Sequence, residues 1–456
     1  MKKIICLLLC LLLVGTLFVG CAREDEPAPA PATTPAPAAP GDTTPAEPPA
    51  AVGEVSQGIT DTEILIGSTF VNTGAAAFFG APIIDTIEAV FARTNAQGGI
   101  AGRQIRFIHY DDQNDPVMGR VLLERLLEED QVFALVGISG VQAGPSLEYM
   151  RDFGAPVINI TGGIAFMYEE YAPGSNIFLI QPSNAWDGAT MLARAISEPL
   201  FGEGRDEYLP EDVVVGLMYA NSDAGRDVYN SVMSLATELG MVDRIVADVV
   251  TPETYHTVIQ SMMNANVGVL LAGSMDSLGI TAAMHDAEWL VPFIGAYGTS
   301  TIQSFSPATF DSRRPVYSNT WADYTTPDAM RMLADLDDAL TYHPTLDEAT
   351  RISYADNNFA RAGYSSAITL VIGLERLAAS GLDFTWENFI HVMEQEYFDL
   401  GGFGRFSFAN GRRMGITELA FFEYYAYMGE DGEWVERQDT VRPFETVEQI
   451  LARRPH

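Results

Sequence analysis

Glycines and small polar residues that directly follow apolar, strand-length runs are the residues of this sequence best suited to hold a ligand. A turn from a strand into a helix leaves backbone N–H groups free, and their partial positive charge suits a carboxylate. Glycine lets a ligand approach the backbone closely, and a hydroxyl can donate or accept a hydrogen bond. The candidates of this kind in the first half of the chain are Ser139, Gly140, Thr161, Gly162 and Gly163, together with Val141, which belongs to the same turn as Ser139. They predict a site for an oxygen of a small solute, although a capped turn and a plain loop are the simpler alternatives.

Enzyme motifs are missing from the sequence. It contains no Gly-x-Gly-x-x-Gly dinucleotide loop, no Gly-Lys-Ser/Thr phosphate loop and no Gly-x-Ser-x-Gly elbow. The six histidines lack metal-ligand spacing, and Asp111–Asp112 lies between a strand and a helix cap, where a structural role is simpler. Cysteine occurs only at positions 6, 10 and 21, so the rest of the chain has no thiolate ligand or nucleophile. We therefore expect no enzyme, no metal and no cofactor.

The N-terminus predicts an export signal and a tether. Lys2 and Lys3 precede an apolar stretch from Ile4 to Val19, which is typical of a secretory signal rather than a membrane span. The signal, residues 1–20, ends in Leu17–Cys21, which resembles the bacterial lipobox and implies that Cys21 is lipidated. Residues 21–57 are rich in Pro, Ala and Thr and predict an extended spacer. We expect an extracytoplasmic, lipid-anchored protein; an ordinary signal peptide with an incidental cysteine is the alternative.

Charge excludes one class of partner. The chain has 26 basic and 61 acidic residues and a net charge of −35. Phosphate binding depends on clusters of cations, so this composition argues against nucleic acid. Hydrophobic residues make up 47% of the chain, enough to bury sizeable cores.

The elements that must position the candidate residues form a β-α alternation from about residue 61 onward. Strands that are apolar throughout, separated by helices, predict parallel sheets covered on both faces, and there are too many for one sheet. We expect two lobes, with the break near Gln181–Asn184, and a final antiparallel section over 401–427 that turns at Asn410–Gly411. The predicted strands are 63–67, 104–110, 132–138, 156–160, 213–219, 244–249, 267–273 and 291–297, and the later helices include 224–239, 255–265, 277–287, 362–380 and 386–396.

An ordered series of short segments resembles the branched-chain-amino-acid type of periplasmic binding protein. The segments are 58–67, 72–80, 95–103, 110–116, 220–225, 273–276, 295–298 and 363–364. The resemblance implies an α/β fold of two doubly wound parallel-sheet lobes joined by a multi-segment hinge. It places 58–182 and about 318–380 in the N-terminal lobe, and 183–317 and about 400–440 in the C-terminal lobe.

The resemblance also implies that the ligand lies between the lobes, at the carboxyl ends of the strands. On the second lobe this gives Asp223, Ala224, Asp276 and Tyr297. The family often has a hydroxyl where this chain has Val141, an aromatic where it has Ala224, and an acid near Tyr297. Asp223 or Asp276 could supply that charge, or each could be a helix N-cap. Phe79 could wall the pocket, or it could simply belong to the core.

The implied function is that of the extracytoplasmic solute-binding component of an ABC importer, closing around a small polar solute such as an amino acid. Its partners would be that solute, the permease subunits and, through the lipid anchor, the membrane. A sensor module of the same fold is an alternative, and an enzyme on an α/β scaffold is a more distant one.

Overall fold

The computed structural model describes residues 55–168, 171–202, 204–273, 276–300, 304–323, 326–355, 357–403 and 405–454, without the side chains of Val141, Gln142, Ile160, Phe403 and Arg405. The predicted signal, Cys21 and most of the predicted tether lie outside these residues. Ser56 and Gln57, predicted as the end of the tether, are bonded into the fold. Ser56 N donates to Phe384 O at 3.0 Å, and Gln57 Nε2 donates to Leu127 O at 2.9 Å. The folded part therefore begins before the predicted boundary at Gly58.

The first sheet is parallel throughout and has the strand order β2-β1-β3-β4-β5 within the described residues. Its strands are β1 (Glu63–Thr69), β2 (Gln104–Tyr110), β3 (Ala134–Ser139), β4 (Val157–Thr161) and β5 (Ile177–Phe178). Every residue of β3 is buried, as expected for a central strand that is covered on both faces. The four strands predicted in this part of the chain are confirmed, and the short β5 was not predicted.

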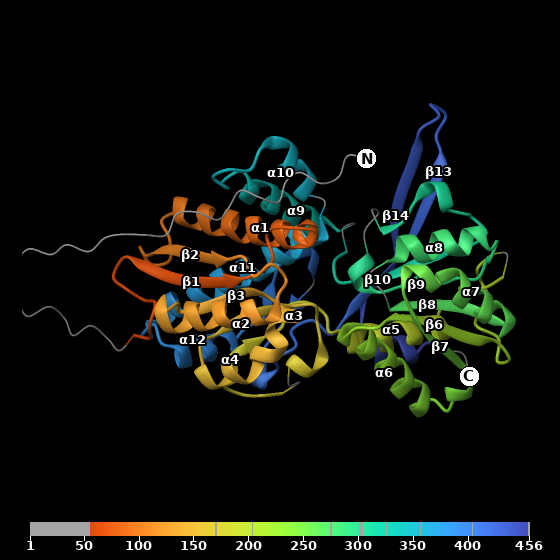
Figure 1. Ribbon diagram of the computed structural model, residues 1–456, viewed down its shortest axis with the longest axis horizontal. Helices are drawn as coiled ribbons and strands as arrows, with labels where there is room; N and C mark the ends of the chain where they lie inside the picture. Colours follow the sequence, from red (N-terminus) through yellow and green to blue (C-terminus); the bar gives the residue numbers. More distant parts are fainter. Residues whose placement is uncertain are drawn as a thin grey trace, which may run out of the picture. The chain divides into compact units, whose positions relative to one another are not determined.

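Helices cover both faces of this sheet, and with them it forms the first lobe. They are α1 (Ala77–Ala96), α2 (Pro116–Glu124), α3 (Gly140–Ala143), α4 (Leu147–Phe153), α9 (Pro327–Leu340), α10 (Glu348–Ala355), α11 (Asn358–Ser380) and α12 (Trp386–Met393). One core joins α1, α9, α11 and α12 to the sheet, and another joins α2, α3 and α4 to it. Figure 1 shows α1 and α2 on opposite sides of β1 and β3. The Asp115 carboxylate accepts from Val117 N at 2.8 Å, which confirms the predicted cap of α2.

The second sheet is mixed and has the order β14-β13-β10-β9-β8-β6-β7 in the part of the chain that is described. Its strands are β6 (Val214–Ala220), β7 (Ile245–Val250), β8 (Val267–Gly273), β9 (Phe293–Gly295), β10 (Val316–Thr320), β13 (Leu419–Met428) and β14 (Trp434–Glu445). The strands from β6 to β10 run parallel, and β13 and β14 run antiparallel at one edge. Figure 1 shows β13 and β14 as a long hairpin.

Two further cores cover the faces of the second sheet, which with its helices forms the second lobe. The helices are α5 (Asn184–Ser197), α6 (Asp223–Glu238), α7 (Tyr255–Asn264), α8 (Ser277–Asp286) and α13 (Val447–Leu451). One core contains α5, α6 and α13, and the other contains α7 and α8. Each lobe is thus a helix–sheet–helix sandwich, and the predicted fold class of two doubly wound lobes is confirmed.

The predicted hairpin at Asn410–Gly411 is wrong. Both residues have positive φ, 60° and 81°, but they form a tight turn in which Gly411 O accepts from Ala172 N at 2.7 Å. The real hairpin joins β13 to β14 around Gly429–Gly432, where Gly429 N donates to Glu433 O at 2.8 Å. The positive φ values of Asn410 and Gly411 therefore belong to a turn that contacts a distant loop, and not to a hairpin. The strand β14 is mostly half-buried, and its sequence shows no apolar alternation that would have revealed it.

The chain passes between the sheets three times. It leaves the first sheet after β5, returns after β10, and enters the second sheet again at β13. β10 (Val316–Thr320) belongs to the second sheet, while Phe398, Phe406 and Phe408 pack in the core with α1 and α11. The small sheet of β11 (Phe398–Asp399) and β12 (Arg405–Phe406) lies in that return segment.

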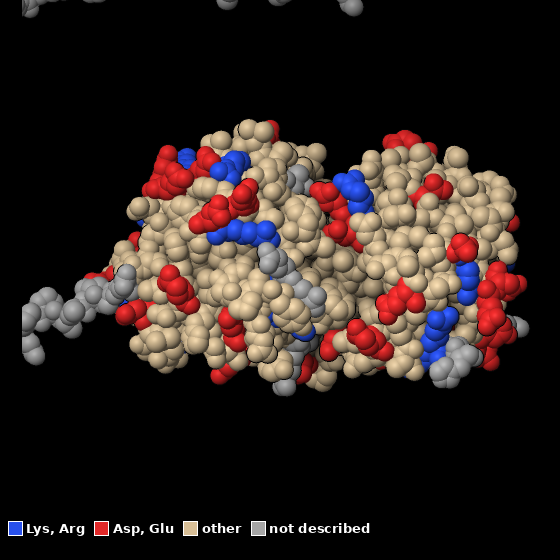
Figure 2. Space-filling model, turned by 90° about the horizontal axis from the view of Figure 1, so that it is seen from below, with Lys and Arg blue, Asp and Glu red and all other residues tan. Residues whose placement is uncertain are grey.

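Acidic side chains are widely spread over the face that Figure 2 shows. On the face drawn in Figure 2 they lie over both lobes and do not gather in one patch. Among the described helices, none combines the length and the apolar composition that a membrane crossing requires.

Close packing of α1 on α11 depends on Gly363. A Cβ at this position would lie 2.4 Å from Ile83 O, far inside the contact distance. We expect Gly363→Ala to lower the free energy of unfolding by about 1–3 kcal/mol through overpacking, although alanine favours helix more than glycine does. Urea unfolding measures this, with the exposed Glu375→Ala on the same helix as the control. Equal stability of both variants would contradict this account of the interface.

Candidate functional site

The carboxyl ends of β3 and β4 lie side by side and form the first part of the site. Ser139 and Thr161, the last residues of these strands, are paired in the parallel register. A Cβ on Gly140 would lie 2.4 Å from Thr161 O, so only glycine lets α3 begin this close to β4. The Thr161 hydroxyl donates to Ile138 O at 3.2 Å. Ser139 is buried at the N-cap position of α3, but its side chain makes no capping hydrogen bond.

Gly162 and Gly163 form the second part. Their φ values are 103° and 58°, a conformation that disfavours residues with a Cβ. A Cβ on Gly163 would also lie 2.4 Å from Pro182 O and 2.9 Å from the Tyr297 hydroxyl. Glycine is therefore needed at position 163 both for the backbone conformation and for these close approaches, and at position 162 for the conformation alone.

A buried glutamine joins this glycine loop to the second lobe. One terminal atom of the Gln181 amide lies 2.8 Å from Gly163 N, 2.9 Å from Gly162 N and 3.1 Å from Tyr297 Oη. Because backbone N–H groups donate, this atom is the carbonyl oxygen Oε1. Burial, followed by the nearby Asp187, raises the pKa of Tyr297 above its usual range, so its hydroxyl keeps the proton and donates. Three donors thus converge on one oxygen.

The backbone of Tyr297 rests on a buried carboxyl group. Asp187, in the first turn of α5, accepts from Tyr297 N at 3.1 Å and from Asn319 Nδ2 at 2.8 Å. Burial raises the pKa of Asp187 to about 7, against the lowering effect of these two hydrogen bonds. Asp187 thereby ties α5 to β10 and to the turn after β9, and this fixes the position of Tyr297.

The loop after β4 is bonded to two helices of the second lobe. Asn184 N donates to Gly163 O at 2.9 Å, and the Asn184 side chain donates to Gly162 O at 2.5 Å. Farther along the loop, Ala165 N donates to the Asp227 carboxylate of α6 at 2.6 Å. Burial raises the pKa of Asp227, with the bond from Ala165 acting in the opposite direction. The strand-end loop of one lobe therefore rests on α5 and α6 of the other.

Asp276 is a helix N-cap in the structure, which is the alternative to ligand binding named for it above. It is the N-cap of α8 and accepts from Gly279 N at 2.8 Å and from the Tyr255 hydroxyl at 2.9 Å. These bonds stay within the second lobe and do not connect Asp276 to the converging donors.

Asp223 is neither a cap nor part of this cluster. Ser222 caps α6 by accepting from Gly225 N at 3.1 Å, and the exposed Asp223 pairs with Arg226 at 2.6 Å. Ala224 follows it in the first turn of α6.

Phe79 packs in an aromatic cluster of the first lobe. Its ring centroid lies 6.0 Å from that of Phe70, 5.2 Å from that of Phe78 and 5.9 Å from that of Phe359. This is the core-packing role named as its alternative. The side chain of Val141 lies outside the described part of the structure.

The sequence reasoning missed four side chains of the site, namely Gln181, Asn184, Asp187 and Asn319. A signal existed for the first two, because polar residues follow the apolar run 177–180 directly at the expected break between lobes. Asp187 and Asn319 gave no such signal, since they meet only through the packing of α5 against β10.

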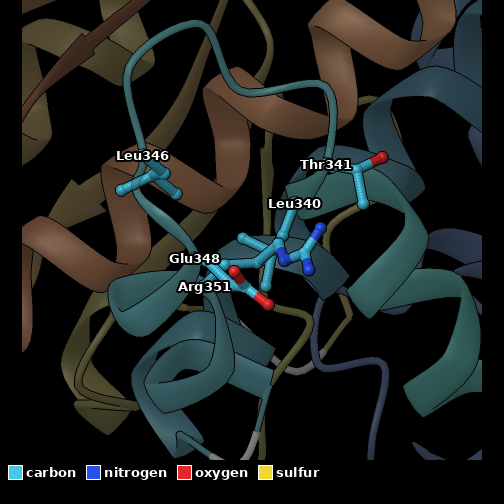
Figure 3. Close-up of a pocket in the computed structure, with 5 residues that line it drawn as sticks. All are labelled: Leu340, Thr341, Leu346, Glu348 and Arg351. Atoms are coloured by element: carbon cyan, nitrogen blue, oxygen red, sulfur yellow. The ribbon is translucent and has the colours of Figure 1, made fainter.

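A separate hollow of about 370 Å³ lies between the end of α9 and α10. Figure 3 shows that Leu340 and Thr341 come from one side, Glu348 and Arg351 from α10, and Leu346 from the loop between them. None of these residues stands at a strand end, so the hollow does not belong to the donor cluster.

Comparison with known proteins agrees with this architecture. The family described as periplasmic binding protein matches residues 63–427. Leu/Ile/Val-binding protein homolog 2 of Brucella abortus (strain 2308) is 22% identical over 222 residues, or 48% of this chain and 56% of that protein. The match thus spans little more than half of that relative.

Many solved structures share the fold, and two of them illustrate the similarity. The solute-binding protein of an ABC transporter from Rhodopseudomonas palustris BisB5, in complex with 3,4-dihydroxy benzoic acid, has a TM-score of 0.63 and 16% identity, covering 84% of this chain and 98% of its own. The ABC transporter substrate-binding protein from Desulfitobacterium hafniense, in complex with Leu, has a TM-score of 0.59 and 14% identity, covering 82% and 100%.

The raised pKa of Asp187 predicts a pH-dependent stability. The folded protein keeps this proton up to about pH 7, whereas the unfolded chain loses it near the ordinary value of 3.8. The proton on Asp187 therefore stabilises the folded state fully below pH 3.8. This contribution to the free energy of unfolding, at most about 4 kcal/mol, is lost as the pH rises to about 7.

Asp187→Asn should remove this dependence, since an amide does not titrate. Urea unfolding at several pH values between 4 and 7 would show the native protein losing stability relative to the variant as pH rises. The exposed Asp337→Asn on α9 is the control. A difference between native and Asp187→Asn that stays constant with pH would contradict the prediction.

Proposed function

The chain belongs to the periplasmic binding protein family, and on that premise we propose that it is the solute-binding component of an ABC import system. Its solute is a small polar compound with a carboxylate, an amino acid or a similar molecule. The named ligands of the two structural neighbours, leucine and a dihydroxybenzoic acid, both carry a carboxylate.

One observation carries the proposal: the Gly162 and Gly163 amides and the Tyr297 hydroxyl converge on a single oxygen. These donors come from both lobes and stand at strand carboxyl ends, where ligands of such folds bind. A carboxylate oxygen suits them well, because charge-assisted hydrogen bonds are roughly twice as strong as neutral ones. Ser139, at the adjacent strand end, would donate its hydroxyl to the second oxygen, and Thr161 would join it by turning its hydroxyl away from Ile138 O.

The same contacts supply a mechanism. A solute that binds donors from both lobes favours the arrangement in which the lobes meet. The bonds from the loop after β4 to Asn184 and Asp227 support that arrangement. A micromolar dissociation constant corresponds to a binding free energy of about 8 kcal/mol. A few charge-assisted hydrogen bonds and apolar contacts can supply this energy. The permease would then recognise the united lobes.

The proposal includes a place outside the cytoplasmic membrane and a lipid anchor on Cys21. Cys21→Ser should move the protein from the membrane fraction to the soluble fraction of cells, because a single acylated cysteine is its expected attachment. Fractionation and labelling with a radioactive fatty acid measure this. Unchanged membrane retention or labelling in the variant would contradict lipidation at Cys21.

The binding site is tested with Ser139→Ala combined with Thr161→Ala. A thermal-shift screen of amino acids and aromatic acids first finds a solute, since binding to the native state raises the melting temperature. Titration calorimetry should then show affinity reduced at least tenfold in the double variant.

The matched control is Ser234→Ala with Thr257→Ala, which removes the same groups from exposed positions on α6 and α7. Equal affinity in both double variants would show that the solute binds elsewhere.

A further inference from the structure

The oxygen that the three donors hold belongs to the protein itself. Gln181 is only 6% exposed, and its Oε1 accepts from Gly162 N, Gly163 N and Tyr297 Oη. The residue stands between β5 and α5, on the first segment that crosses between the lobes. Its position on the chain therefore places the acceptor of the donor cluster on a segment that joins the lobes.

The donors need an acceptor whenever they are buried. A buried N–H group without a partner costs about 1–3 kcal/mol, and here two adjacent amides point to the same place. The positive φ values of Gly162 and Gly163 turn both amides toward Gln181. An acceptor supplied by the chain removes this cost when no other oxygen is present.

We propose that Gln181 is an internal competitor for the solute: its side-chain oxygen occupies the place of the solute's carboxylate oxygen and must leave before the solute binds. This inference rests on the proposed function of the strand-end site. It makes Gln181 a specificity-determining residue, because only a solute whose oxygen is a stronger acceptor than a neutral amide displaces it.

The competition predicts whether each of two substitutions at Gln181 strengthens or weakens carboxylate binding. An apolar side chain of similar length, Gln181→Leu, leaves the donors without an internal acceptor and should strengthen carboxylate binding about threefold to tenfold. The apparent dissociation constant falls as the fraction of sites free to bind rises. Gln181→Glu places a carboxylate of the chain itself among the donors, and its charge-assisted bonds should weaken solute binding at least tenfold.

Binding is measured by calorimetry with L-leucine and 3,4-dihydroxybenzoate, and with leucinamide, which lacks a carboxylate. The control is Gln260→Glu, which makes the same change of charge on the exposed face of α7. Gln260→Glu should match the native protein with every probe. The leucinamide affinity should change less than the carboxylate affinities in the Gln181 variants.

A second measurement does not need a solute. Hydrogen exchange of the Gly162 and Gly163 amides should be at least tenfold faster in Gln181→Leu than in the native protein, and slower in Gln181→Glu. Circular dichroism checks that each variant is folded. Equal exchange in the native protein and both Gln181 variants overturns the inference whatever the solute is.

The two proposals fail in different ways. If a carboxylate probe binds the native protein and both Gln181 variants with equal affinity, the internal competition is overturned and the proposed function stands. If no carboxylate probe binds the native protein or any variant, the carboxylate-binding function is overturned, and the competition falls with it.

Discussion

The requirement that buried backbone donors have acceptors governs this protein. At the ends of β3 and β4 the chain turns through Gly162 and Gly163, whose N–H groups face inward. Parallel sheets collect such groups at one edge, because every strand of the sheet ends there. An acceptor must meet them, and in this structure the side chain of Gln181 supplies it.

A buried carboxyl group fixes the donor that the second lobe contributes to the candidate site. Asp187 holds the backbone of Tyr297 and the side chain of Asn319, so one carboxyl group orients the hydroxyl that faces the glycine loop. A buried acid carries a desolvation cost, which its raised pKa reflects. The turn that carries Tyr297 is held by hydrogen bonds to the Asp187 carboxyl group.

Local sequence predicts which residues stand at strand ends, but it does not predict which of them face the candidate site. Ser139, Thr161, Gly162 and Gly163 were predicted because they follow apolar strands, and the parallel register brings Ser139 and Thr161 together. Their role in binding stays a prediction. Asp223 and Asp276 follow strands too, but the first pairs with Arg226 and the second caps α8. A carboxylate after a strand serves a helix start as readily as a ligand, and only its contacts separate the two roles.

The sequence by itself determined the alternation of strands and helices, the two lobes and the strand-end turns, because periodicity and glycine placement are local properties. It did not reveal that Asn410–Gly411 serves a turn against the 172–173 loop, or that β14 completes the second sheet. Nor did it show Gln181 among the donors. These features depend on segments far apart in the chain that meet only after the sheets have packed, so the tertiary structure alone decided them.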